Sequence, residues 1–363
     1  MAYEAGSGAG IRAGGCDAAR AVERPNACAR GWPGLGADRH APEWLGKDNR
    51  MASMEASQTR VSVIGLGSMG YGMAQSLAKG GFAVTGYDTR AEMVAKFASE
   101  HGSGASSLAE AAANADILVI VVVNADQTQQ VLLGEGGLVA SAKPGAVIVS
   151  CATMAPERAR ALGDAVTAAG LHYVDAPISG GAARAAEGAL TMLVSGPPAA
   201  IDKARAAFDA MSAKLYLLGD EVGIGASFKI VNQLLAGVHI AAASEAIVFA
   251  KRLGLDIARV YEVITASAGN SWMFENRMPH VLEGDYAPKS AVEIFTKDLG
   301  IIADISRSEK FATPIASSAL QMFLMTAAAG MGKDDDASVA RLYAQIAGIE
   351  LPAKDTKTQD SKD

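Results

Sequence analysis

Hydrophobic residues follow two different patterns along this chain of 363 residues. Between residues 58 and 222, short runs rich in Val and Ile alternate with Ala-rich stretches of helical periodicity. From Gly223 to about Ile349 the strand pattern stops and only the helical period remains. This order predicts a domain of alternating strands and helices, followed by an all-helical domain. A helix from about Gly225 to Leu253 would be about 40 Å long and could join the two.

The two ends of the chain lack this patterning. Residues 1–57 show neither period, so we exclude them from the fold and interpret them as a disordered or non-native extension. They lack the apolar core of a secretory signal and carry more acidic residues than a transit peptide. Met51 and Met54 precede the first strand, which favours a start codon placed too far upstream; the alternative is a tail that binds a partner. Residues 351–363 are expected to form a flexible tail.

Composition narrows the class of protein. Half of the residues are hydrophobic, and the length suffices for two domains with separate cores. The net charge of -7 comes without a long Lys or Arg block, which argues against a nucleic-acid partner. No unbroken apolar run reaches the roughly 20 residues of a membrane span, so we expect no membrane partner. Cys16, Cys28 and Cys151 have no metal-type spacing and fit a reducing cytoplasm.

The first predicted strand ends in a glycine loop. The run Val61–Ile64 is followed by Gly65-Leu66-Gly67-Ser68-Met69-Gly70 and by a helical stretch to Lys79. Gly65 would permit the tight turn, Gly67 would let the backbone approach a pyrophosphate, and Gly70 would let the helix pack on the strand. The predicted fold class is therefore an α/β Rossmann-type N-terminal domain, residues 58–222, and an all-α C-terminal domain, residues 223–350, joined by a long interdomain helix.

Residues at later strand ends extend this candidate cofactor site. The strand Ala83–Tyr87 leads to Asp88, at the distance where an acidic residue binds the adenosine ribose, which favours NAD over NADP. Arg90 could instead hold a 2′-phosphate, and Asp88 could be a simple turn residue. Strands at Ile117–Val123 and Ala146–Ser150 would place further cofactor contacts at their carboxyl ends. These contacts are Val123, Asn124 and Thr153, although Asn124 and Thr153 are also ordinary helix caps.

Candidate substrate residues follow. A strand from Leu171 runs into Ser179-Gly180-Gly181, where backbone N–H groups and a hydroxyl could hold a carboxylate. The alternative is a plain turn before the strand Leu190–Val194. Lys229 and Asn232 share one face of the long apolar helix, and a buried ammonium there needs an anion, hydroxyl or water. The pair is a candidate for proton transfer; the alternative is a lysine that snorkels at a helix start.

Two later segments are weaker candidates. Asn270, Ser271 and Trp272 could lie along the substrate cavity, although a capped helix start with core aromatics explains them as well. Lys297 could supply a second cation, or could form an exposed ion pair with Asp298. The five histidines are dispersed, and no His/Asp cluster has ligand spacing, so no metal site is predicted.

Together these motifs resemble the β-hydroxyacid dehydrogenase family, which includes 3-hydroxyisobutyrate dehydrogenase and tartronate semialdehyde reductase. The resemblance covers about residues 58–350 and rests on four stretches in family order: Gly65–Gly70, Asp175–Gly181, Gly225 through Lys229 to Asn232, and Lys297–Leu299. Residues 234–242, 268–277 and 284–286 most resemble the L-threonate dehydrogenase subfamily, which oxidises a sugar acid at C2. Val123-Asn124 stands where many members of the family have Leu-Pro. Cys151-Ala152-Thr153 replaces the commoner Ser-Ser/Thr pattern, so that only Thr153 can be assigned as a cofactor contact by the resemblance.

The resemblance implies residue roles. Lys229 would be the catalytic acid and base, Asn232 would orient the substrate, and Lys297 would contact the cofactor near the nicotinamide. The predicted substrate-binding residues are Ser179, Gly180, Gly181, Asn232, Asn270 and Trp272. The predicted cofactor-binding residues are Gly65, Leu66, Gly67, Ser68, Met69, Gly70, Asp88, Arg90, Val123, Asn124, Thr153 and Lys297.

The expected activity is NAD-dependent oxidation of a small hydroxy acid, foremost L-threonate to 2-dehydro-L-erythronate. Oxidation requires a neutral Lys229. Burial, Lys297 and the nicotinamide ring would lower the pKa of Lys229, whereas a substrate carboxylate would raise it. The alternatives are a 3-hydroxyisobutyrate dehydrogenase, a tartronate semialdehyde or glyoxylate-type reductase, and a non-catalytic dinucleotide-binding protein. An imine reductase usually has another residue at the position of Lys229. The long apolar helix suggests a homodimer or homotetramer, although packing within one subunit would explain it equally well.

Overall fold

A nine-stranded, mostly parallel sheet forms the first half of the structure, a computed structural model that describes residues 58–354. The interpretations of residues 1–57 and 355–363 lie outside the described residues. The strands are β1 (Arg60–Ile64), β2 (Ala83–Tyr87), β3 (Ser103–Gly104), β4 (Ile117–Ile120), β5 (Val147–Ser150), β6 (His172–Asp175), β7 (Ile178–Ser179), β8 (Leu190–Ser195) and β9 (Ser212–Gly219). Their order is β3-β2-β1-β4-β5-β6-β8-β7, and β9 pairs with β8. Strands β1 to β6 are parallel, whereas β8 runs antiparallel to β6 and β7.

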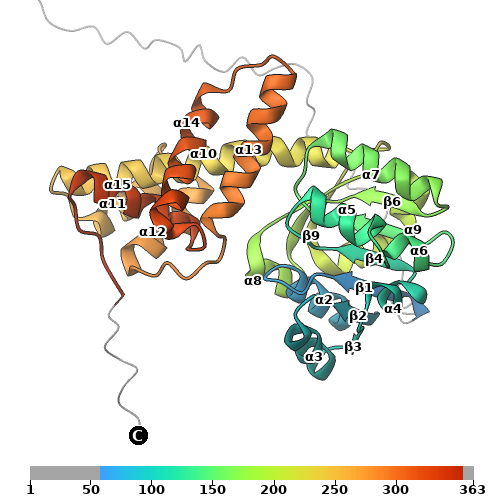
Figure 1. The fold of residues 1–363 in the computed structure, drawn as a ribbon. Coiled ribbons are helices and arrows are strands. Elements are labelled where there is room, and N and C mark those ends of the chain that lie inside the picture. Colours follow the sequence, from blue (N-terminus) through green and yellow to red (C-terminus); the bar gives the residue numbers. More distant parts are fainter. Residues whose placement is uncertain (1–57, 355–363) are drawn as a thin grey trace, which may run out of the picture. The chain divides into compact units, whose positions relative to one another are not determined.

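Both faces of this sheet are covered by helices (Figure 1). The β-branched strand residues alternate between two buried clusters, with Val61 and Val63 in one and Ile64 in the other. This alternation is the pattern of a parallel sheet that is buried on both sides. The covering helices are α2 (Gly70–Lys79), α3 (Ala91–Glu100), α4 (Leu108–Ala113), α5 (Ala125–Leu133), α6 (Leu138–Ser141), α7 (Pro156–Ala168), α8 (Gly181–Ala186) and α9 (Pro198–Met211).

Three details of this half differ from the sequence-based expectation. Strand β4 ends at Ile120 rather than Val123, because its partners Ile64 and Ser150 are the last residues of β1 and β5. The Gly-rich turn does not lead directly to the next strand but opens the short helix α8. Strand β9 had not been expected, because its mostly exposed residues show no clear alternation.

The second half contains helices joined by loops. They are α10 (Ile224–Arg252), α11 (Ile257–Thr265), α12 (Trp272–Glu283), α13 (Val292–Ser308), α14 (Pro314–Thr326), the π turn η1 (Ala327–Met331), the 3-10 turn η2 (Asp336–Ser338) and α15 (Val339–Ala347). Helix α10 contacts β6, β8 and β9 on one side and α11 to α15 on the other, so it joins the two halves. The predicted fold class is confirmed.

Within the described residues, two helical segments are long and apolar enough to cross a membrane by length and composition alone, α10 and Pro314–Met331. In α10, however, 56% of the apolar window is buried inside the protein. A central helix that packs against both halves of a molecule has this character without any membrane.

Candidate active site

The glycine loop between β1 and α2 has the geometry of a dinucleotide loop. Gly65 has a φ of +97°, and a Cβ there would lie 2.4 Å from the carbonyl oxygen of Val121. A Cβ on Gly70 would lie 1.8 Å from the Gly65 oxygen, so only glycine allows the helix to start this close to the strand. A Cβ on Gly67 would meet no atom within 4 Å. The loop is therefore tight on its inner side and open where a pyrophosphate would approach.

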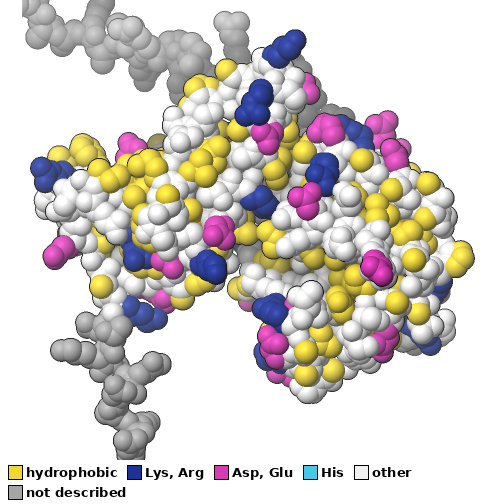
Figure 2. All heavy atoms as spheres, in the orientation of Figure 1, with side chains coloured by type: hydrophobic (Ala, Val, Ile, Leu, Met, Phe, Trp, Pro, Cys, Tyr) yellow, Lys and Arg dark blue, Asp and Glu magenta, His cyan; other side chains and the backbone are white. Residues whose placement is uncertain are grey.

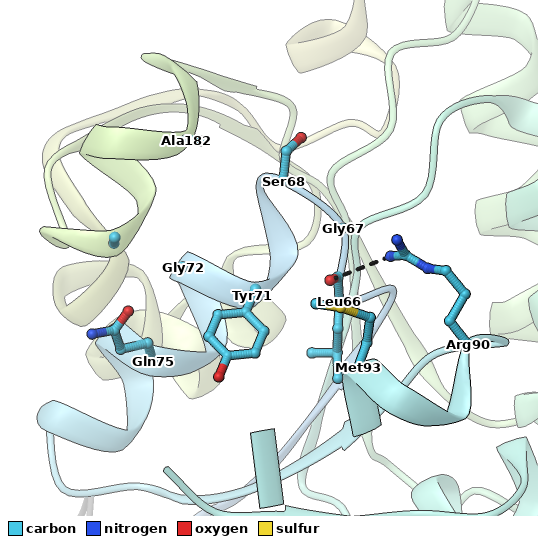
Figure 3. A pocket seen from close by; sticks show the side chains of 10 residues that line it. Leu66, Gly67, Ser68, Tyr71, Gly72, Gln75, Arg90, Met93 and Ala182 are labelled. Atoms are coloured by element: carbon cyan, nitrogen blue, oxygen red, sulfur yellow. Dashed lines mark hydrogen bonds between the residues drawn. The ribbon is translucent and has the colours of Figure 1, made fainter. Parts of the chain in front are cut away.

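The other loop residues are placed differently. Leu66 is fully buried, so only its backbone is available to a ligand. Ser68 is exposed, and Met69 forms the N-cap position of α2. A cavity of about 270 Å³ lies beside this loop. Residues of α2, α3 and α8 line it together with Arg90 (Figure 3). The loop thus borders a recess in the surface.

Asp88 follows β2 and contacts this loop. Its Oδ2 accepts a hydrogen bond of 2.7 Å from the backbone N–H of Leu66, and Arg90 lies 3.0 Å from its Oδ1. Partial burial alone would raise the pKa of Asp88, but the hydrogen bonds from Arg90 and Leu66 outweigh it and lower that pKa. The Arg90 guanidinium also reaches the Leu66 carbonyl oxygen at 3.5 Å (Figure 3). An ionised carboxylate therefore lies at the position expected to bind ribose hydroxyls.

The predicted contacts after β4 and β5 are at the carboxyl ends of their strands. Asn124 caps α5, since its side chain accepts a hydrogen bond from Gln127 N, as the capping alternative predicts. Thr153 is half-buried and does not cap a helix, because the N-cap residue of α7 is Ala155. The backbone oxygen of Val123 accepts a 2.7 Å hydrogen bond from Lys297 Nζ. This bond connects the loop after β4 to α13.

The candidate carboxylate cradle, which consists of Ser179, Gly180 and Gly181, lies at the start of α8. Gly180 and Gly181 have φ angles of +138° and +80°, and Ser179 ends β7. Helix α8 packs against α2: Ser76 Oγ donates to the Ala185 oxygen at 2.8 Å, and a Cβ on Gly72 would lie 2.6 Å from Ala186 N. The helix that follows the cradle is thus packed directly against the helix that follows the glycine loop.

Helix α10 begins beside β6 and β8. The buried carboxylate of Asp175 accepts hydrogen bonds from Gly223 N at 3.2 Å and Ala226 N at 2.7 Å, as an acidic group at a helix N-terminus should. Burial raises the pKa of Asp175 to about 6 although these two bonds lower it. A Cβ on Gly225 would lie 2.4 Å from the Leu193 oxygen. These contacts fix where the first turns of α10 place Lys229.

Lys229 is buried, with 7% of its surface exposed. Within residues 58–354 its ammonium has no hydrogen-bond or ion-pair partner. Burial lowers the pKa of Lys229 to about 8; Asp298 acts against this shift and Lys297 adds to it. A lysine of this kind exchanges a proton near neutral pH. The snorkelling alternative is wrong, because the side chain is buried rather than extended into solvent.

The remaining candidates are placed as follows. Lys297 contacts Asp298 Oδ1 at 2.8 Å, and Asp298 is buried, so the exposed ion-pair alternative is wrong. Asn270 bonds within its own segment, to Thr265 O and Glu275, and Ser271 caps α12. Trp272 is 49% exposed, so it is not a core aromatic. No hydrogen bond in the described part of the chain links Asn270 or Trp272 to Lys229 or Asn232.

The sequence reasoning missed Gln233. It lies next to Asn232, is buried, and bonds to both Asn232 and Asp298. A third polar residue in the otherwise apolar run of residues 228–235 was the available signal. Among residues 58–354 no cluster of three His, Cys, Asp or Glu side chains could hold a metal ion.

Known proteins share this architecture. A family model described as the NAD binding domain of 6-phosphogluconate dehydrogenase matches residues 60–219. A second, described as the NAD-binding region of NADP-dependent 3-hydroxyisobutyrate dehydrogenase, matches residues 223–343.

Individual relatives cover most of the chain. An L-threonate dehydrogenase of Cupriavidus necator is 49% identical over 81% of this chain and 98% of its own length. One from Escherichia coli K12 is 43% identical over 82% of this chain and 97% of its own length. The solved structure of a 3-hydroxyisobutyrate dehydrogenase from Salmonella typhimurium has a TM-score of 0.75 and 44% identity, and covers 78% of this chain and all of its own. The chain therefore belongs to the NAD-binding hydroxyacid dehydrogenases related to 3-hydroxyisobutyrate dehydrogenase.

Proposed function

We propose that this dehydrogenase oxidises L-threonate at C2 to 2-dehydro-L-erythronate, with NAD as cofactor and Lys229 as general acid and base. Relatives named L-threonate dehydrogenase, at 43–49% identity over most of the chain, support the choice of substrate. The observation that carries the mechanism is the buried Lys229, which has no partner in the described part of the chain and whose pKa falls to about 8. Such a group needs a ligand that can receive or give a proton.

In this mechanism each group has one task. The glycine loop fits NAD, because it is open at Gly67 and carries the Asp88 carboxylate at its edge. Bound NAD supplies the hydride acceptor at C4 of its nicotinamide ring. Neutral Lys229 removes the proton of the substrate hydroxyl at Nζ, and Asn232 orients that hydroxyl. Ser179, Gly180 and Gly181 hold the substrate carboxylate, and Lys297 contacts the cofactor near the nicotinamide.

Asp88 supports NAD over NADP. Its pKa is lowered, so the carboxylate is ionised at neutral pH and would repel a 2′-phosphate. Arg90 is paired with that carboxylate, which neutralises part of its charge. The proposed cofactor contacts further include Val123, Asn124 and Thr153, and the proposed substrate contacts include Asn270 and Trp272.

The exposed apolar residues of the helical half support a homodimer or homotetramer. Val231 is 62% exposed on α10, and Ile315 is 70% exposed on α14. Figure 2 shows further hydrophobic side chains on the surface of this half. Exposed apolar patches of this kind mark protein interfaces, and light scattering of the intact chain would give the oligomer mass. We place the enzyme in the cytoplasm, without a nucleic-acid or membrane partner.

A substrate panel tests the proposal. The full chain is assayed for NADH or NADPH formation with L-threonate, D-threonate, D-erythronate, 3-hydroxyisobutyrate and D-glycerate, each with NAD and with NADP. We expect the highest kcat/KM with L-threonate and NAD. Preference for 3-hydroxyisobutyrate would favour the second candidate function, which the Salmonella typhimurium structure supports by its name. No turnover with any acid would contradict both.

A further inference from the structure

A chain of polar side chains crosses the apolar contact between α10 and α13. Asn232 Nδ2 donates to Gln233 Oε1 at 2.9 Å, and Gln233 Nε2 donates to Asp298 Oδ2 at 2.5 Å. Asp298 Oδ1 lies 2.8 Å from Lys297 Nζ, which in turn donates to the Val123 oxygen. Gln233 and Asp298 are 7% and 1% exposed. These bonds therefore run from the helix of Lys229, through the buried Gln233 and Asp298, to the loop that follows β4.

The chemistry of Asp298 sets the direction of every bond in this chain. A carboxylate beside an ammonium only accepts hydrogen bonds, so Gln233 must turn its NH2 group toward Asp298. The carbonyl oxygen of Gln233 then faces Asn232, which must present its own NH2 group. Among residues 58–354, Asn232 Oδ1 and its second N–H have no hydrogen-bond partner. A side-chain amide that could otherwise flip by 180° is thereby held in one orientation.

We propose that Gln233 is a positioning residue of the dehydrogenase reaction: it holds Asn232 with one N–H free to donate to the oxygen of the substrate hydroxyl, and it holds Asp298 beside Lys297. This inference rests on the proposed role of Lys229 and adds a residue that does not itself touch the substrate. The hydroxyl oxygen that accepts this bond is the one whose proton passes to Lys229, since Asn232 and Lys229 share one face of α10.

Gln233 also affects the charge that Lys229 experiences. The charged groups that act on Lys229 are Asp298 and Lys297, both on α13. Burial lowers the pKa of Lys229 most strongly, while Asp298 raises it. The hydrogen bond from Gln233 satisfies part of the Asp298 carboxylate and so limits this opposing effect. Without that bond, Asp298 would stabilise the Lys229 ammonium more strongly, and the pKa of Lys229 would rise.

Two substitutions separate these effects. Gln233→Met keeps the length of the side chain but removes both hydrogen bonds, so we expect kcat to fall about tenfold and KM for L-threonate to rise. Gln233→Glu places a second carboxylate against Asp298, so we expect the acid limb of the kcat/KM profile to move up by about one pH unit. Gln321→Glu, at an exposed position of α14, adds the same charge outside this series of hydrogen-bonded side chains and serves as the control.

A reciprocal exchange tests the direction of the bonds. In the double variant Gln233→Glu with Asp298→Asn, a carboxylate at 233 would accept from both neighbouring amides. We expect its kcat to exceed that of Gln233→Glu alone. NADH affinity and Tm, measured on every variant, should stay near the wild-type values.

The possible outcomes are distinct. The inference is overturned if both Gln233 variants keep the wild-type pH profile, kcat and KM while Lys229→Ala is inactive; the proposed function then stands. It is also overturned if the Gln233 variants lose NADH binding, Tm and turnover together, because that would be a purely structural role. Turnover by Lys229→Ala would instead reject the proposed function itself.

Discussion

At the scale of single residues, the site depends on a lysine that is ionisable near neutral pH. Lys229 is buried away from solvent, and no described group neutralises it directly. A buried ammonium is costly, and the molecule reduces this cost by lowering the pKa rather than by adding a salt bridge. The same shift leaves a base that can take the proton of the substrate hydroxyl while the hydride leaves the carbon that carries this hydroxyl.

The pH dependence follows from this shift. Oxidation needs neutral Lys229, and the pKa of this side chain falls from 10.5 to about 8. The kcat/KM for NADH formation should therefore rise with pH up to about 8 and then level off, whereas the reverse reaction should slow above that pH. Initial rates between pH 6 and 10 give this profile. A rise that continues to pH 10 would show a lysine with an ordinary pKa.

Single residues also show what the sequence could and could not reveal. The three glycines of the first loop could be assigned roles in advance, because turn geometry and close approach depend on local backbone. The bond between Gln233 and Asp298 could not be predicted, because the two residues are 65 positions apart. Ser271 and Asn124 were correctly considered as caps, since capping depends on neighbours three residues away.

At the scale of elements, the start of α10 decides the geometry of the site. It is held by Asp175 at the end of β6 and by the close approach of Gly225 to β8. Elements with a strong local period, such as β1, β2 and α10, could be predicted from the sequence. Strand β9 and helix α8 could not, because an exposed edge strand and a six-residue helix carry too little periodic signal.

Substitution of Gly225 tests this packing. In Gly225→Ala the new Cβ would lie 2.4 Å from the Leu193 oxygen, so the first turn of α10 must shift. We expect kcat/KM to fall about 100-fold, since small misplacements of a catalytic group cost about this much, while NADH binding changes little. Ser227→Ala, on an exposed position of the same turn, is the control. Unchanged kcat/KM in Gly225→Ala would mean that this contact does not position Lys229.

At the scale of the whole molecule, the described chain brings together groups from distant segments. The α2–α8 packing connects the helix after the glycine loop with the helix after the candidate cradle, and the bonds through Asp298 and Val123 connect α10 and α13 with the loop after β4. The order of motifs along the chain indicated the family, which the comparisons confirm. Whether Asn270 and Trp272 approach the substrate stays a prediction.

The most direct test of the account compares NADH formation from L-threonate by the wild-type chain and by Lys229→Ala. The account predicts rapid NADH formation by the wild-type protein and a loss of at least about 1,000-fold in kcat for the variant, with NADH affinity and Tm near the wild-type values. Comparable turnover by Lys229→Ala would contradict the assignment of Lys229 as the acid and base, whatever the substrate.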